Sequence, residues 1–158
     1  MSKTVKTMTI ARALKEKNRI AGRLNTVRTR IANYNSCEIT NNKRPFDIEE
    51  LFQENKKLEE NLVAIKAGIS RANAGIVDKI NKLGEIKAEI TWLNNVSTRE
   101  GKYTENGYGG KIEREFTAVI SANKIVQETE ALQKECEDLQ DEIDAYNASH
   151  SVDIELFD

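Results

Sequence analysis

One stretch of the sequence, residues 48–72, constrains the fold more than any other because its apolar residues recur at alternating steps of three and four. This spacing is that of the a and d positions of a heptad, and it predicts an amphipathic helix with one narrow apolar stripe. In water such a helix needs a partner that covers the stripe, from this chain or from another. The stripe consists of Ile48, Leu51, Asn55, Leu58, Leu62, Ile65, Ile69 and Ala72.

Three further segments repeat the helical pattern, so the sequence predicts a mainly α protein. We expect four long helices packed as antiparallel coiled-coil-like hairpins with a small β element, all within a single domain over residues 1–158. The fourth helix carries its own stripe, which includes Leu132, Leu139 and Ile143. The expected helices span about residues 9–35, 47–73, 76–95 and 122–148.

Single residues add detail to this arrangement. Asp47, followed three residues later by Glu50, predicts the start of the second helix by a capping-box-like pattern. Asn55 is the one polar residue inside the central stripe. It is either a buried residue that fixes helix register and oligomer number, or a partly exposed residue near a helix end. Gly22, in the middle of the first predicted helix, indicates a place where another helix approaches closely.

The helical pattern stops at residues 94–110, which are rich in glycine and asparagine. We expect a loop or the tip of a wide hairpin there, which can present itself to a protein partner. Residues 112–120 alternate apolar and polar side chains and predict a strand. A lone strand leaves its backbone groups unpaired, so it needs a neighbour. The candidate neighbours are residues 102–104, residues 37–40, residues 152–157 and a strand of another subunit.

Charge is unevenly distributed along the chain. Residues 1–44 contain 11 Lys/Arg and 2 Asp/Glu, whereas residues 128–158 contain 11 Asp/Glu and 1 Lys. A free basic arm suggests nucleic acid or anionic lipid, but an acidic segment in the same molecule favours pairing of the two segments, within one chain or between subunits. We therefore expect no nucleic-acid partner. If there were one, the contacts would come from Arg12, Arg19, Arg23, Arg28 and Arg30.

The sequence contains no recognisable catalytic or metal-binding pattern. His150 is the single histidine and is flanked by serines, and neither Cys37 nor Cys136 lies in a metal-ligand spacing. We therefore expect no enzymatic activity, no cofactor and no metal. The cysteine usage suggests a reducing compartment, and no apolar run approaches the roughly 18 residues that span a bilayer. The expected location is the cytoplasm, without contact with a membrane.

Four motifs occur in a specific order around the glycine-rich segment and the predicted strand. Residues 13–17 read Ala-Leu-Lys-Glu-Lys, residues 48–51 read Ile-Glu-Glu-Leu, residues 69–73 read Ile-Ser-Arg-Ala-Asn, and residues 139–147 read Leu-Gln-Asp-Glu-Ile-Asp-Ala-Tyr-Asn. In this order they resemble the septicolysin-like family of small, uncharacterised bacterial helical proteins. The resemblance implies a helical, oligomeric protein of unknown activity.

The resemblance is incomplete at both of the family's more specific patterns. Of its Ile-Asn-x-Thr-Asn helix end, Ile69 and Asn73 are present, and of its closing Leu-Asp-x-x-Ile-Gln-x-x-Asn-Trp, Ile143 and Asn147 match while Ala148 replaces the tryptophan. A lytic activity is not carried over, because the sequence has no amphipathic lytic segment.

These patterns favour a non-enzymatic structural or interaction protein that forms a homo-oligomer, since four patterned helices exceed what one thin bundle hides. The alternatives are nucleic-acid binding through the basic first helix and a prefoldin-like holdase, a chaperone that retains unfolded clients. The residues expected in the core or oligomer seam are Ile48, Leu51, Asn55, Leu58, Leu62, Ile65, Ile69, Leu132, Leu139 and Ile143.

Overall fold

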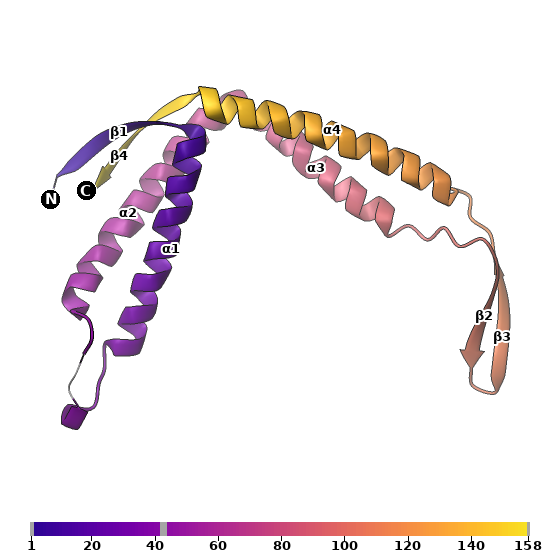
Figure 1. Cartoon of the computed structure of the whole chain (residues 1–158), viewed down its shortest axis with the longest axis horizontal. Coiled ribbons are helices and arrows are strands. Elements are labelled where there is room, and N and C mark those ends of the chain that lie inside the picture. The colour runs from indigo at the N-terminus through magenta and orange to yellow at the C-terminus, as the bar shows by residue number, and fades with distance from the viewer. Residues whose placement is uncertain (1, 42–43, 158) are drawn as a thin grey trace. The chain divides into compact units, whose positions relative to one another are not determined.

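A computed structural model of the chain describes residues 2–41 and 44–157. Over these residues it is mainly α-helical with four α-helices and two small antiparallel sheets, which confirms the predicted mainly α class with a small β element (Figure 1). None of its described helices is long and apolar enough to cross a bilayer. The elements in chain order are β1 (Lys3–Thr9), α1 (Ile10–Tyr34), η1 (Ile39–Asn41), α2 (Ile48–Ala72), η2 (Asn73–Gly75), α3 (Val77–Asn94), β2 (Gly101–Gly107), β3 (Gly110–Phe116), α4 (Ala122–Ser149) and β4 (Ser151–Phe157).

The chain packs as two compact units, which are described separately. Unit 1 holds residues 1–77 and 144–158, and unit 2 holds residues 78–143. The single domain expected over residues 1–158 stays a prediction.

Each of the four helices begins and ends within one residue of its predicted bounds, because local signals fix its ends. The side chain of Asp47 accepts a hydrogen bond from the backbone N–H of Glu50 at 3.1 Å, as the capping pattern predicts. Thr9 caps α1 in the same way, and its Oγ1 lies 3.2 Å from the backbone nitrogen of Arg12. These caps satisfy N–H groups that have no partner inside their own helix.

Unit 1 is built on α1 and α2, which lie side by side with α2 running back along α1 (Figure 1). A two-stranded ribbon of β1 and β4 packs against α2, and two residues of β4 enter the core. Six residues from α1, α2 and β4 form this core, so neither the helix pair nor the ribbon buries its apolar side chains alone. They are Ala13, Ile20, Ile65, Ile69, Ile154 and Leu156.

The β1–β4 ribbon joins the two ends of the chain. Its strands are antiparallel and pair Lys3 with Phe157 and Thr9 with Ser151. The alternating Val152, Ile154 and Leu156 form the strand β4. Its neighbour is β1, so residues 152–157 are not the partner of the strand predicted at 112–120. β1 is not among the elements predicted from the sequence, although its threonines and Val5 are β-branched residues that favour strands. Residues 37–40, another candidate strand, contain the start of η1.

Unit 2 consists of most of α3 and α4 and the β2–β3 hairpin. Leu83, Ile86 and Leu93 of α3 are buried, as are Leu139 and Ile143 of α4. Two ion pairs, Lys79–Glu142 and Lys82–Glu135, join the helices. Most other side chains of these two helices are exposed.

The β2–β3 hairpin corrects two predicted boundaries. The strand expected over 112–120 begins at Gly110 and ends at Phe116, and the loop expected over 94–110 contains all of β2. Its neighbour is the 102–104 segment, which was one of the candidates. The sequence pattern of β2 is weak because both of its faces are largely exposed, so no alternation is required. At the turn, Gly109 and Gly110 have φ angles of 108° and 135°, which favour glycine.

Candidate interaction groove

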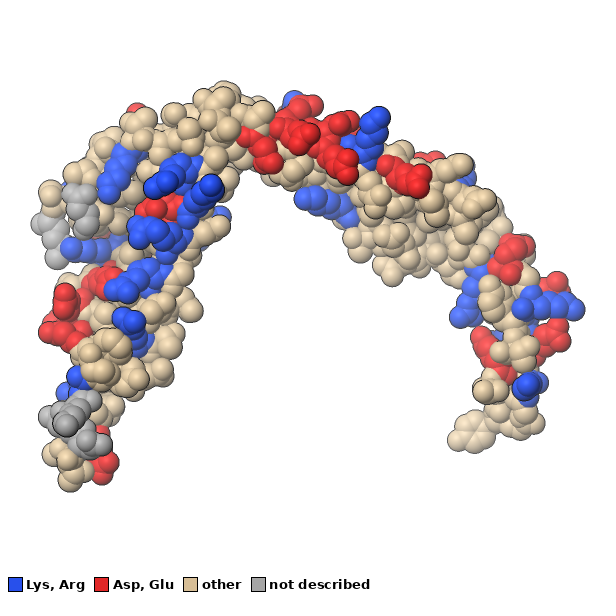
Figure 2. All heavy atoms as spheres, in the orientation of Figure 1, with Lys and Arg blue, Asp and Glu red and all other residues tan. Residues whose placement is uncertain are grey.

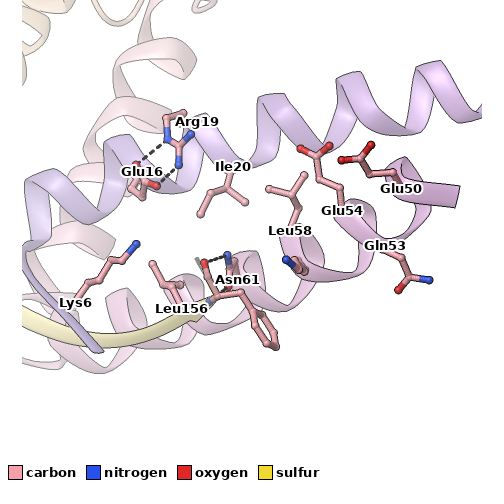
Figure 3. A pocket seen from close by; sticks show the side chains of 12 residues that line it. Lys6, Glu16, Arg19, Ile20, Glu50, Gln53, Glu54, Leu58, Asn61 and Leu156 are labelled. Carbon is pink, nitrogen blue, oxygen red and sulfur yellow. Dashed lines mark hydrogen bonds and ion pairs between the residues drawn. The ribbon is translucent and has the colours of Figure 1, made fainter. Parts of the chain in front are cut away.

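Unit 1 contains a groove of about 560 Å³ between α1, α2 and the end of the ribbon (Figure 3). Its apolar floor is formed by Ile20, Leu58, Leu156 and Phe157. A hollow of about 300 Å³ shares part of this lining and extends the groove toward Met8 and Arg12. Polar and charged side chains form the rim: Lys6, Glu16, Arg19, Glu50, Gln53, Glu54, Lys57 and Asn61.

Asn61 fixes the end of β4 beside the groove. Its side-chain Nδ2 donates to the carbonyl oxygen of Phe157 at 3.1 Å, and its Oδ1 accepts from the N–H of Phe157 at 2.7 Å. The side-chain amide of Asn61 thus donates one hydrogen bond to the backbone of Phe157 and accepts one from it, as the backbone of a neighbouring strand would. Since these backbone groups point away from β1, the two bonds satisfy them and hold Phe157 at the groove wall.

The charges of the groove differ between its two ends. Lys6, Arg19 and Glu16 lie at the end near the ribbon, whereas Glu50 and Glu54 lie at the other end (Figure 3). Arg12 adds a further cation to the ribbon end. The ribbon end therefore carries more cations than carboxylates. At the other end Glu54 is paired with Arg23, so Glu50 is the carboxylate there without an ion pair among the described residues, and Lys57 lies next to Leu58 between the two ends.

The carboxylate of Glu16 is held by a forked contact with Arg19. Arg19 donates from Nε to Oε2 at 2.9 Å and from Nη2 to Oε1 at 2.5 Å. These hydrogen bonds lower the pKa of Glu16 below its ordinary value; partial burial opposes the shift, and the charges of Arg19, Arg12 and Lys6 add to it. Because the pKa is lower in the folded state, the contact stabilises the fold above the carboxyl's unfolded-state pKa. That stabilisation is lost as the pH falls through the folded-state pKa.

Replacing Arg19 by glutamine should raise the pKa of Glu16, because the strongest hydrogen bonds to its charged form are removed. The pKa can be measured by following the carboxyl carbon of Glu16 by NMR during a pH titration. Arg30→Gln is the matched control on the same helix, since Arg30 lies over the ring of Phe46 and not beside Glu16. An unchanged pKa in Arg19→Gln would show that the forked contact does not hold Glu16 in solution.

Two arginines of the basic first helix, Arg23 and Arg28, are paired with residues of α2. Arg23 donates to both carboxylate oxygens of Glu54 at 2.6 and 2.9 Å. Arg28 donates to Oδ1 of Asn55 at 3.0 Å and lies 3.6 Å from Glu59. Asn55, half-buried in the stripe, is thus bonded across the two helices. Of the five arginines that were candidates for nucleic-acid contacts, Arg12 and Arg30 have side chains without an ion pair or hydrogen bond in the described part of the chain, and the guanidinium of Arg30 lies over the ring of Phe46.

Within one chain, the basic N-terminal segment does meet the acidic C-terminal segment, because β1 pairs with β4, whereas the arginines of α1 with ion pairs bond to residues of α1 and α2. Figure 2 shows the Lys and Arg side chains gathered over α1 and the acidic side chains over the middle of α4. The acidic residues of α4 meet Lys79 and Lys82 of α3 instead. The sequence shows two oppositely charged segments. Which of their charges meet depends on which helices are neighbours in the fold.

The predicted seam residues fall into two groups by burial. Leu51, Ile65, Ile69, Leu139 and Ile143 are buried. Half-buried members are Ile48, Asn55, Leu58, Leu62 and Leu132, and of these Leu58 lines the groove.

Several groove residues escaped the sequence analysis, namely Lys6, Asn61 and Phe157. The alternation at 152–156 was the one available signal, because it placed a strand near Phe157. Nothing local marked Lys6 or Asn61.

No cluster of three or more His, Cys, Asp or Glu that could hold a metal occurs among residues 2–41 and 44–157. His150 stacks on the ring of Tyr146, with 3.7 Å between ring centroids, and its Nδ1 lies 3.0 Å from the carbonyl oxygen of Tyr146. Its ring therefore forms part of the end of α4.

Comparisons with known proteins bear on the fold and not on the activity. No family model and no curated protein matches the sequence. A solved structure is similar, with a TM-score of 0.77 and 14% sequence identity over 93% of this chain and 99% of the other. It is described as the crystal structure of a functionally unknown conserved protein from Corynebacterium diphtheriae. At this identity the likeness shows a shared fold.

Proposed function

We propose that this protein is a non-enzymatic structural and interaction module that assembles with itself in the cytoplasm, its helices packing as coiled-coil-like hairpins. The charged side chains of the groove support the non-enzymatic part of the proposal. Arg19 and Arg23 are both held by carboxylates in forked contacts, so they serve the fold rather than a reacting group.

The proposal of self-assembly rests on the amount of surface that the chain exposes. The chain exposes 11431 Å². A compact monomer of 17.9 kDa exposes about 8,000 Å², and two separate compact domains that share this mass equally would expose about 9,700 Å². The excess over the larger figure is about 1,700 Å². Association of copies would remove such surface from water.

The solution mass tests this proposal. We expect light scattering on a sizing column to give a multiple of 17.9 kDa at low salt. A mass that remains 17.9 kDa up to the highest attainable protein concentration would contradict self-assembly. Repeating the measurement at high salt separates apolar from ionic association, because salt screens contacts between exposed charges.

A second candidate function, the holdase, is favoured by exposed apolar side chains in unit 2. Trp92 is 62% exposed and Val119 is fully exposed. Ile120 and Val126 are about half exposed, and Tyr108 projects from the hairpin turn. Side chains of this kind can contact unfolded clients. Delayed aggregation of a heat-denatured test protein would support this activity, and unchanged aggregation at equimolar protein would contradict it.

A further inference from the structure

We propose that the groove of unit 1 is the surface through which two copies of this chain pair, antiparallel to each other about a two-fold axis. The inference rests on the self-assembly proposed above and adds the surface and the residues that meet. Arg12 of each copy would lie against Glu50 of the other.

The charges of the groove complement those of a second, reversed groove. The ribbon end carries Arg12 and Arg19, with Lys6 and Glu16 beside them. The other end carries Glu50 and Glu54, of which Glu54 is paired with Arg23, and Lys57 lies next to Leu58 between the two ends. When one copy is reversed along the groove, each positive end meets a negative end. A two-fold interface uses the same patch on both copies, so one patch must carry both charges, as this groove does.

The spacing of the two key residues agrees with this symmetry. Ile20 and Leu58 face the middle of the groove (Figure 3). Arg12 precedes Ile20 by eight residues on α1, and Glu50 precedes Leu58 by eight residues on α2. At 1.5 Å per residue, each lies about 12 Å from the middle, on opposite sides because the helices run in opposite directions. A two-fold axis near Ile20 and Leu58 therefore brings Arg12 of one copy to the level of Glu50 of the other.

Both residues are available for such a contact. Neither the Arg12 nor the Glu50 side chain makes an ion pair or hydrogen bond within the described ranges; the capping bonds to these residues go to their backbone nitrogens. By contrast, Glu54 is held by Arg23, and Glu16 by Arg19. The charge of Arg12 acts on Glu16 without an ion pair between them, so Arg12 and Glu50 are charges at the two ends of the groove that have no direct ion-pair partner among the described residues.

The exposed area fits a second copy as the occupant. A stable interface of standard size takes about 800 Å² from each partner, and the excess exposed surface estimated above is more than that. The centre of the contact would hold Leu58 and Phe157, which are half-buried, with charged residues around them. Such a small apolar centre with an ionic rim predicts a dimer whose affinity falls with salt.

A nucleic acid fits the groove less well. Glu50 and Glu54 line one half of it, and Glu16 lies among the cations of the other half. A phosphate chain that followed the groove would meet carboxylates in both halves, and these repel its negative charge. Fluorescence anisotropy with a labelled single-stranded oligonucleotide at low salt tests this occupant directly.

Reversal of single charges tests the pairing. In Arg12→Glu and in Glu50→Arg, two like-charge contacts replace two attractive ones in each dimer, so each variant should raise the dissociation constant at least tenfold. In the double variant Arg12→Glu/Glu50→Arg the pairs are opposite in charge again, and the dissociation constant should return to within about threefold of the original. Sedimentation of the full chain at about 0.1 M salt, where the screening length is about 10 Å, measures all three constants.

Lys15→Glu is the matched control, because it reverses a charge on the same helix outside the groove lining and should leave the dissociation constant unchanged. Circular dichroism confirms that every variant is folded. Loss of dimer in the single variants without recovery in the double variant would overturn the proposed pairing. An oligomer that none of the reversals affects would overturn the groove as interface while self-assembly stands. A chain that is monomeric throughout, or an oligonucleotide bound in place of a second copy, would overturn both.

Discussion

Replacing Ile65 by alanine should lower the free energy of unfolding by about 3 kcal/mol, within the usual range for a buried isoleucine. The Ile65 side chain is fully buried and belongs to the core formed by α1, α2 and β4. Ala13 and Ile20 approach from α1 and Ile154 from β4. Because three elements form its surroundings, they cannot close the cavity by the shift of a single helix, and the loss should not fall to the low end of the range.

Urea denaturation followed by far-UV circular dichroism measures this loss. Val63→Ala is the matched control: Val63 lies on the same helix but is 64% exposed, so its replacement should change the free energy of unfolding by less than about 0.5 kcal/mol. An equal effect of the two replacements would show that the core does not form around Ile65.

Replacing Gly68 by valine should lower the free energy of unfolding by about 2 kcal/mol, because β4 packs directly against α2 at this residue. A Cβ atom on Gly68 would lie 2.9 Å from Cγ1 of Ile154, 3.2 Å from its Cδ1 and 3.4 Å from Cγ2 of Val152. Ile154 is itself 2% exposed and has no free space to move into. The added side chain should therefore push the ribbon away from the helix and open the core.

Gly22→Val provides the matched control for Gly68→Val. A Cβ on Gly22 meets no atom within 4 Å, so the added side chain is free of clashes, and the higher helix propensity of valine should raise stability by a few tenths of a kcal/mol. Thermal melts of the two variants should shift in opposite directions. If both shift upward, the close packing of β4 on α2 is absent in solution.

The same pair of glycines shows where sequence interpretation fails. Gly22 was predicted to mark the close approach of another helix, and this was wrong: the space around it is open. The close approach occurs at Gly68, and the neighbour is a strand rather than a helix. Both glycines lie inside helical patterns, so the sequence offers no local difference between them. The difference arises from β4, which is about 85 residues further along the chain.

The sequence by itself determined the four helices, their ends and the residues of the central stripe that face inward. These features depend on neighbours three or four positions apart and on capping side chains such as Asp47, so they can be read from short windows. Leu51, Ile65 and Ile69 are buried as the stripe predicted.

Only the tertiary structure decided how the two ends of the chain meet. β1 was not predicted, and it pairs with β4, so that the ribbon joins residues as far apart as Lys3 and Phe157. That contact supplies Ile154 and Leu156 to the core and Lys6 and Phe157 to the groove. The partners of the arginines were decided in the same way. Strand pairing and charge pairing depend on residues that are distant in sequence, and no periodicity within a segment records which distant segment will lie beside it.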